Sequence, residues 1–144
     1  MDTLGRHLIA EYYHCDRELL NDLDAVSAAL GAAAERIGAT VLQVGAHRYA
    51  PQGVTVTLIV AESHLSIHTW PDHGYAAADI FTCGGLDPRP GFELLRVRLG
   101  AREARVQIIV RGTDRHVEAG RDLLPEDVVL MSSIAALEAE GTGE

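Results

Sequence analysis

The stretch from Glu62 to Asp72 holds the densest set of side chains that could do chemistry in this 144-residue chain. Polar and apolar residues alternate from Ser63 to Trp70, which predicts a strand. The turn-forming residues Pro71 to Gly74 then predict that the chain reverses into a second strand, which ends near Cys83. Pairing of these two strands would bring Cys83 to the same end of the hairpin as Ser63, so that a thiol, a hydroxyl and an imidazole could converge.

Other kinds of reactive site fit these residues less well. His64 and His68 stand four residues apart, which would suit a metal on a helix, but the alternation favours a strand and no third ligand stands nearby in the sequence. Ser63 lacks a Gly-x-Ser-x-Gly elbow, so a hydrolase nucleophile is unsupported. A single cysteine such as Cys83 is more often a small buried residue than an acid or a nucleophile. Spacing alone therefore predicts no metal site and leaves the reaction unassigned.

The basic residues are all arginine: Lys and Arg together number 12, and none of them is lysine. Pyridoxal phosphate enzymes hold their cofactor on a lysine, and P-loops place a lysine on nucleotide phosphates, so neither mechanism is expected. The formal net charge of −9 argues against nucleic acid as a partner, because nucleic-acid-binding proteins gather basic residues against phosphates. A small cationic substrate suits the chain better.

Composition predicts one compact domain, since 47% of the residues are hydrophobic. The sequence shows no apolar run of about 18 residues that could cross a membrane and no signal-peptide pattern at its start. Cys15 and Cys83 are too few for the disulfide framework of a small secreted domain. We therefore expect a cytoplasmic protein without a membrane partner.

The order of predicted elements indicates an α+β fold. Strands are expected over residues 4–14, 40–49, 54–61, 63–70, 75–83 and 104–110, and helices over residues 17–37 and over the stretch that carries Phe92 to Leu99. This order predicts one antiparallel sheet with two helices packed on one face, a two-layer sandwich. Strands near residues 58–60 and 107–110 are apolar on both faces, so the uncovered face of the sheet predicts dimerisation. Residues 113–144 are expected to form a poorly ordered tail, with a marginal helix over residues 128–137.

Four motifs taken together resemble one known family. They are Leu4-Gly5-Arg6-His7-Leu8, Glu62-Ser63-His64-Leu65-Ser66-Ile67-His68-Thr69-Trp70-Pro71, Gly74-Tyr75-Ala76-Ala77 and Phe81-Thr82-Cys83-Gly84. With them, residues 1–112 resemble the short prokaryotic S-adenosylmethionine decarboxylases, which depend on a pyruvoyl group and supply the aminopropyl donor for spermidine and other polyamines.

The resemblance implies a zymogen that cuts itself between Glu62 and Ser63 into residues 1–62 and 63–144. Ser63 would become a covalent pyruvoyl group, which forms a Schiff base with the substrate amine and accepts the electrons released with carbon dioxide. A pyruvoyl carbonyl needs no lysine and no pyridoxal phosphate, which agrees with the composition. The family's active sites lie between two protomers, so the resemblance also implies a homodimer.

The resemblance further implies a role for each residue that matches the motifs. His68 would accept a proton during processing, Cys83 would donate one during decarboxylation, and Thr55 would hold the oxygen of the processing intermediate. Expected substrate contacts are Tyr49, Leu65, Ile67, His68 and Asp72.

Three of these residues depart from the family's usual pattern. Thr55 stands where serine is common and keeps the hydroxyl, and Tyr49 replaces a phenylalanine that stacks on adenine. Asp72 replaces a glutamate that holds the ribose hydroxyls, and aspartate is shorter by one methylene. Asp72 leaves open a pyruvoyl-dependent arginine or ornithine decarboxylase as an alternative. A small α+β module that binds a ligand without catalysis is the alternative from another class.

Overall fold

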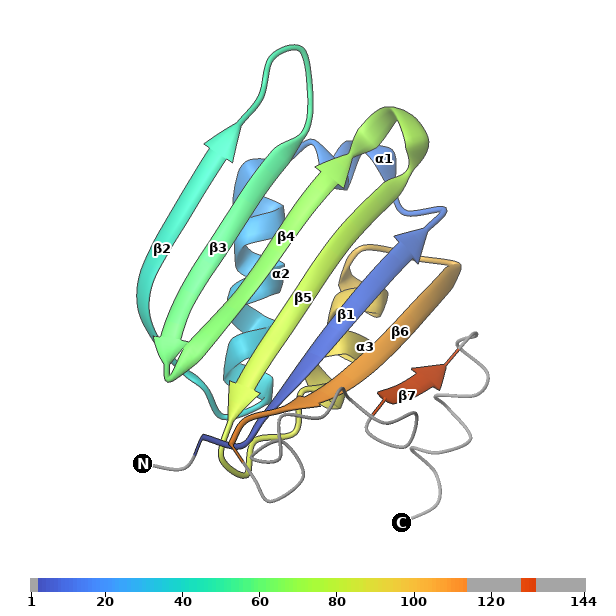
Figure 1. The fold of residues 1–144 in the computed structure, drawn as a ribbon. Coiled ribbons are helices and arrows are strands. Elements are labelled where there is room, and N and C mark those ends of the chain that lie inside the picture. Colours follow the sequence, from blue (N-terminus) through green and yellow to red (C-terminus); the bar gives the residue numbers. More distant parts are fainter. Residues whose placement is uncertain (1–2, 114–127, 132–144) are drawn as a thin grey trace.

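The protein is described by a computed structural model that covers residues 3–113 and 128–131. Its elements in chain order are β1 (Gly5–Tyr13), α1 (Arg17–Leu20), α2 (Leu23–Arg36), β2 (Thr40–Arg48), β3 (Val54–Ala61), β4 (Ser63–Trp70), the short 3₁₀ helix η1 (Pro71–His73), β5 (Tyr75–Cys83), α3 (Arg89–Arg98), β6 (Glu103–Arg111) and β7 (Val128–Met131). The strands form one sheet in the order β2-β3-β4-β5-β1-β6-β7, and every neighbouring pair is antiparallel. Figure 1 shows α2 and α3 side by side against one face of this sheet, which confirms the predicted α+β sandwich.

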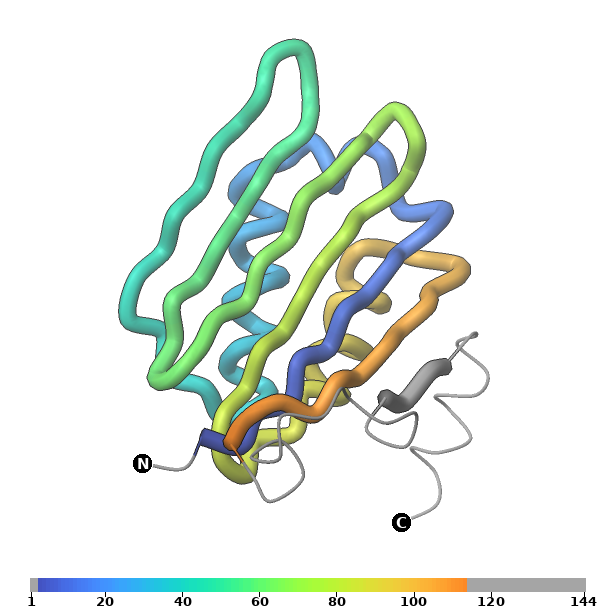
Figure 2. The backbone as a smooth tube through the Cα atoms, in the orientation of Figure 1, coloured from blue at the N-terminus to red at the C-terminus, as the bar shows by residue number. Residues whose placement is uncertain are grey.

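The backbone trace in Figure 2 shows that most of the sheet is built from hairpins. Strands β2 to β5 follow one another along the chain and pair in sequence order, while β1 enters between β5 and β6. The turn between β4 and β5 lies where the sequence places it, and it ends on Gly74, whose φ of 59° is the left-handed conformation that glycine adopts without strain. This turn fixes how β4 and β5 face each other, and therefore how the reactive residues meet.

The expected single helix over residues 17–37 is wrong, because the chain forms two helices with a break at Asn21 and Asp22. The Asp22 carboxylate accepts a hydrogen bond from the Ala25 N–H at 3.0 Å, which starts α2 as a new helix. Asn21 accepts a hydrogen bond through its side-chain oxygen from the Gly53 N–H at 3.0 Å. The break therefore ties the helical layer to the loop between β2 and β3.

Residues 128–131 form strand β7 on the edge of β6, so the helix expected over residues 128–137 is wrong for this part. Residues 132–137 lie outside the described residues. A run of β-branched residues, Val128-Val129, fits an edge strand as well as a helix, and pairing with β6 decides between them.

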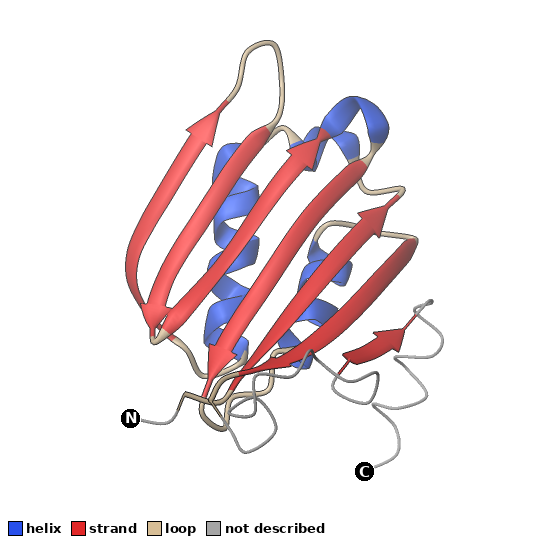
Figure 3. Ribbon diagram, in the orientation of Figure 1, coloured by secondary structure: helices blue, strands red, loops and turns tan. Residues whose placement is uncertain are grey.

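The core lies between the sheet and the helices (Figure 3). Tyr12 on β1 is fully buried, stacks on Phe92 of α3 with ring centroids 5.3 Å apart, and donates its hydroxyl to the Phe92 carbonyl at 2.9 Å. Gly91 lets α3 approach closely, because a Cβ there would lie 3.1 Å from side-chain atoms of both Ile37 and Ile80. Burial of such side chains contributes about 1.5–3 kcal/mol each, so this layer stabilises the sheet.

The other face of the sheet has no helix over it within the described ranges, as Figure 3 shows. Large hydrophobic side chains stand exposed there, among them Ile9, Ile59 and Trp70. We call this the open face. All the strong candidates for chemistry lie on it or at its rim.

Candidate active site

Ser63 and Cys83 meet at one end of the open face. Ser63 is the first residue of β4 and Cys83 the last of β5, and the Ser63 Oγ lies 3.0 Å from the Cys83 Sγ. Both side chains are half-buried, whereas Glu62 in the turn before Ser63 is exposed. The predicted convergence of thiol and hydroxyl is confirmed. A serine hydroxyl directly after a peptide carbonyl is also the arrangement that an acyl shift from nitrogen to oxygen needs.

Thr55, His68 and Tyr49 meet near the other end of the same strands. Thr55 on β3 is directly opposite His68 on β4, and the Thr55 Oγ lies 2.8 Å from the His68 Nδ1. Thr55 also donates to the Tyr49 hydroxyl at 3.2 Å. The antiparallel register of β3 and β4 therefore produces a connected group of hydroxyl, imidazole and phenol.

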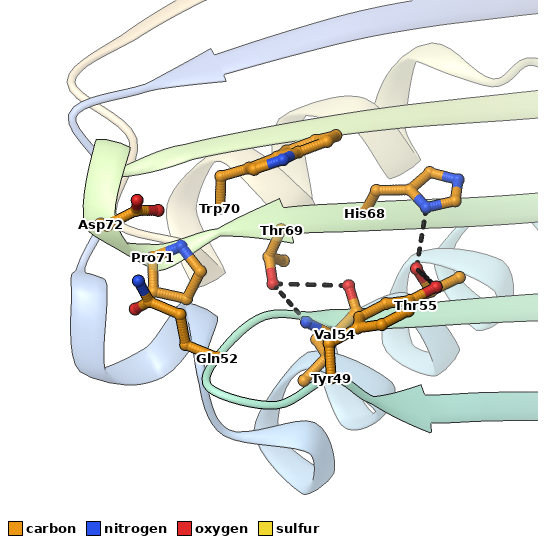
Figure 4. Close-up of a pocket in the computed structure, with 9 residues that line it drawn as sticks. All are labelled: Tyr49, Gln52, Val54, Thr55, His68, Thr69, Trp70, Pro71 and Asp72. Atoms are coloured by element: carbon orange, nitrogen blue, oxygen red, sulfur yellow. Dashed lines mark hydrogen bonds between the residues drawn. The ribbon is translucent and has the colours of Figure 1, made fainter.

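This group borders a cavity of about 270 Å³ (Figure 4). The residues that line it are Tyr49, Gln52, Val54, Thr55, His68, Thr69, Trp70, Pro71 and Asp72. Asp72 is exposed at the rim, 3.5 Å from the imidazole of His73. Aromatic walls with one carboxylate at the edge can take a flat, positively charged ligand.

Three of the five expected substrate contacts line this cavity, namely Tyr49, His68 and Asp72. Leu65 and Ile67 do not, because their side chains are fully buried on the helix side of the sheet. Any contact that these two residues make with a ligand on the open face must therefore come from their backbone.

The two ends are far apart within one chain. Ser63 and His68 are five residues apart on the same strand, which corresponds to about 17 Å. The imidazole expected to take a proton from Ser63 therefore cannot reach it in the same chain. The structure brings Ser63 together with Cys83, and His68 together with Thr55 and Tyr49, but it does not bring the two groups together.

A hydrogen-bond network that the sequence did not reveal lies between the two ends. The Asp79 carboxylate on β5 accepts from His7 Nε2 at 2.6 Å, from His64 Nε2 at 2.9 Å and from the Ser66 hydroxyl. Burial raises the pKa of the Asp79 carboxyl, but the hydrogen bonds from Ser66, His7 and His64 outweigh it, so its pKa lies below the usual 3.8. Asp79 is thus held as a carboxylate on the open face.

The same three side chains offer the geometry of a metal site, since ligand atoms of His7, His64 and Asp79 lie within 4.8 Å of one another. The His64–His68 pair weighed in the sequence analysis is not part of this cluster, because His64 instead lies beside His7 and Asp79, which come from other strands. Arg111 decides what the cluster does: its guanidinium donates to His7 Nδ1 at 3.1 Å, so neutral His7 carries its proton on Nε2. That Nε2–H points at Asp79, so in this arrangement the three side chains and Arg111 form a hydrogen-bond network.

Comparison with known proteins assigns the chain to a family. The model of the family described as S-adenosylmethionine decarboxylase matches residues 6–112. The chain belongs to the S-adenosylmethionine decarboxylase family. The matched residues run from β1 to the end of β6 and include both ends of the open face.

Relatives of high similarity carry the same family name. The S-adenosylmethionine decarboxylase proenzyme of Thermotoga maritima is 44% identical over 128 residues, which cover 88% of this chain and 95% of that protein. The proenzyme of Geobacillus kaustophilus is 45% identical over 112 residues, covering 78% and 90%. Among solved structures, the adenosylmethionine decarboxylase of Aquifex aeolicus matches with a TM-score of 0.73 and 29% identity over 80% of this chain and 96% of that one.

Two residues near the candidate site, Trp70 and Asp79, were not among the site residues expected from the sequence. Trp70 lines the cavity and stacks on Tyr75 at 5.2 Å, and the Tyr75 hydroxyl donates to Glu11. The period-2 alternation placed Trp70 on the same face as His68, which was a usable signal. Asp79 gave a weaker signal, as the only charged residue in a strand of small and apolar side chains.

Proposed function

We propose that this protein is a self-cleaving proenzyme that decarboxylates S-adenosylmethionine through a pyruvoyl group made from Ser63. The observation that supports this most directly is the Ser63–Cys83 pair, 3.0 Å apart, at the point where the family's motif is cut. A residue that becomes the electrophile and a thiol that can supply a proton stand side by side. The product would be the decarboxylated aminopropyl donor used for polyamines.

Self-cleavage can be written with the chain's own atoms. The Ser63 Oγ attacks the Glu62 carbonyl, the peptide C–N bond breaks, and an ester replaces the amide. A base then removes the Ser63 α-proton, the Glu62 carboxylate leaves, and dehydroalanine remains at the new amino terminus. Its enamine tautomerises, and water replaces the nitrogen, which departs as ammonia. The exposed position of Glu62 lets the new carboxylate move into solvent.

The residues present fit the pyruvoyl group. Once formed, its carbonyl binds the substrate amine and accepts the electron pair released with carbon dioxide. The Cys83 thiol lies 3.0 Å from the Ser63 side chain and can protonate the carbon that loses the carboxylate. The chain has no lysine to hold pyridoxal phosphate, so the pyruvoyl group is the electron sink that its composition allows.

We infer that the complete site needs two chains. Ser63 and His68 lie about 17 Å apart on one strand, but two open faces packed with opposite strand directions would set the Ser63–Cys83 end of one chain over the cavity of its partner. An isologous twofold contact then makes two identical sites. The exposed Ile9, Ile59 and Trp70 would be buried in the same contact.

The cavity suits S-adenosylmethionine as the substrate. The faces of Tyr49 and His68 can stack on adenine, and Asp72 can hold ribose hydroxyls, with a bridging water to make up the missing methylene. The relatives are named for S-adenosylmethionine rather than for arginine or ornithine, and a cationic sulfonium suits a chain of net charge −9.

Within the described ranges no helix is both long enough and apolar enough to span a bilayer. We propose a cytoplasmic enzyme.

The first test is the intact mass of the purified protein. Two species are expected, residues 1–62 and residues 63–144. The second should be lighter than a fragment with a free amino-terminal serine by the mass of one ammonia. Release of labelled carbon dioxide should then be faster from carboxyl-labelled S-adenosylmethionine than from arginine or ornithine. A protein that stays as one uncut chain after prolonged incubation would refute the proposal and favour a non-catalytic binding module.

A further inference from the structure

The phenol of Tyr49 makes a contact that ring stacking on a substrate does not require. Its hydroxyl accepts a hydrogen bond from the Thr55 Oγ at 3.2 Å, and the same Thr55 Oγ lies 2.8 Å from the His68 Nδ1. Thr55 is therefore shared between a phenol and an imidazole. The direction of the two hydrogen bonds determines the state of the imidazole.

A threonine hydroxyl has one proton to give. Thr55 gives that proton to the Tyr49 hydroxyl, so towards His68 the Thr55 oxygen can only accept. His68 must then donate from Nδ1, and neutral His68 carries its proton on Nδ1. Its Nε2 is left with a free lone pair, and this is the nitrogen that can act as a base.

We propose that Tyr49 is a positioning residue that sets the tautomer of His68 through Thr55 and so leaves His68 Nε2 free to accept the proton during self-cleavage. This inference rests on the proposed function for the role of His68, but its structural part stands on the two hydrogen bonds. Without the phenol oxygen, the Thr55 proton is free to point at His68 Nδ1. The imidazole can then hold its proton on Nε2, where it cannot act as a base.

The position of Tyr49 is well supported, although the side chain is exposed. Its backbone N–H donates to the Gly53 carbonyl at 2.8 Å, which closes the loop between β2 and β3. Its ring packs against His47 in an edge-on arrangement with centroids 4.6 Å apart. The hydroxyl is therefore held near Thr55 by a loop closure and a ring contact that remain when the oxygen is removed.

Tyr49→Phe tests this with the least disturbance, because it removes one oxygen and keeps the ring. Self-cleavage should slow roughly tenfold, since base catalysis depends on the population of the right tautomer, while the KM for S-adenosylmethionine should stay within about twofold because the stacking ring remains. Tyr13→Phe is the matched control, with the same oxygen removed from a tyrosine on β1 outside the cavity, and should cleave normally.

A spectroscopic readout separates the tautomer from activity. Long-range ¹H–¹⁵N correlation spectra of ¹⁵N-histidine-labelled Ser63→Ala proenzyme, which cannot cut itself, should show His68 with a protonated Nδ1 and an unprotonated Nε2. A Ser63→Ala/Tyr49→Phe proenzyme should shift towards the opposite pattern. Identical His68 signals in the two proteins, or Tyr49→Phe cleaving as fast as wild type, would overturn the inference. Failure of the wild-type chain to cleave would instead refute the proposed function, with the spectra still deciding the tautomer.

Discussion

The two ends of strand β4 are built for different tasks. The Ser63 end pairs a hydroxyl with a thiol at 3.0 Å and follows the exposed residue Glu62. The His68 end has the cavity, its aromatic walls and the Thr55–His68 hydrogen bond. In the proposed function, the Ser63 end would make and break covalent bonds, and the His68 end would hold the ligand and accept a proton.

Under the proposed function, this difference means that one chain contains two half-sites. Each half is well formed, but a rigid β-strand keeps the two about 17 Å apart. Between them, Asp79 joins His7, His64 and Ser66 in a network on the same open face. Substitutions at the two ends and in the network should therefore give three distinct patterns of loss.

The largest effect is expected at Ser63. Ser63→Ala removes the hydroxyl proposed to attack the Glu62 carbonyl, so cleavage and decarboxylation should both be abolished. Denaturing electrophoresis and intact mass should show one uncut chain. Ser27→Ala on α2, which lies far from the open face, should cleave normally, and a cut or active Ser63→Ala protein would refute the chemistry assigned to this end.

A substitution at the cavity end should also impair self-cleavage, but for a different reason. His68→Ala removes the proposed base, so self-cleavage should slow by a factor of roughly 10²–10⁴. The ester formed at Ser63 should then accumulate, and hydroxylamine should cut it. Wild-type cleavage kinetics in His68→Ala would remove His68 from this role and leave the cavity with substrate binding alone.

Cys83 should separate the two reactions. Cys83→Ala keeps the Ser63 hydroxyl, so the chain should still be cut, but the kcat for decarboxylation should fall by a factor of roughly 10²–10⁴ because the proton donor is lost. Product analysis should also show products in which the intermediate was protonated at the wrong carbon. Full activity of the cut variant would assign the proton donor to another group.

The Asp79 network should affect stability more than chemistry. Asp79→Asn replaces charge-assisted hydrogen bonds by neutral ones and should lower the free energy of unfolding by about 1–2 kcal/mol. The folded-state pKa of Asp79 is below 3.8, so its stabilisation is present above that pH and is lost as the pH falls through the lowered value. Chemical denaturation should therefore show a gap between wild type and variant that closes in acid, and a gap that does not change with pH would contradict this account.

The smallest effect is expected at Asp72. Asp72→Glu adds the methylene that would let the carboxylate reach ribose hydroxyls directly, so the KM for S-adenosylmethionine should fall about two- to fivefold, which is less than one direct hydrogen bond to a charged group is worth. Self-cleavage should not change, because Asp72 lies at the rim of the cavity. A higher KM in Asp72→Glu would show that the shorter side chain already fits its ligand.

The hairpin that carries the site could be predicted from the sequence for a physical reason. Alternation with period 2 places His64, Ser66 and His68 on one face of β4, and a turn at Pro71–Gly74 fixes the register with β5. The position of Cys83 beside Ser63 follows from that register. Local patterns were sufficient there because the two strands are joined by a short turn.

Contacts between distant segments were not predictable in this way. His7 reaches Asp79 because β1 pairs with β5, and no local pattern states which strand lies beside which. The break between α1 and α2 also escaped, because the apolar spacing continues through Asn21 and Asp22 while their side chains are used for capping and for the Gly53 contact. Side-chain hydrogen bonds here overrode hydrophobic periodicity.

Cleavage of a mixed dimer tests the claim of two half-sites most directly. Ser63→Ala and His68→Ala chains, distinguished by a tag and co-expressed, should form a heterodimer in which one site has both Ser63 and His68 intact. About half of the His68→Ala chains should then be cut in a random mixture, while the Ser63→Ala chains stay whole and each variant alone stays uncut. If the mixture cuts no more than the two separate variants, Ser63 and His68 do not meet between chains and the account is wrong.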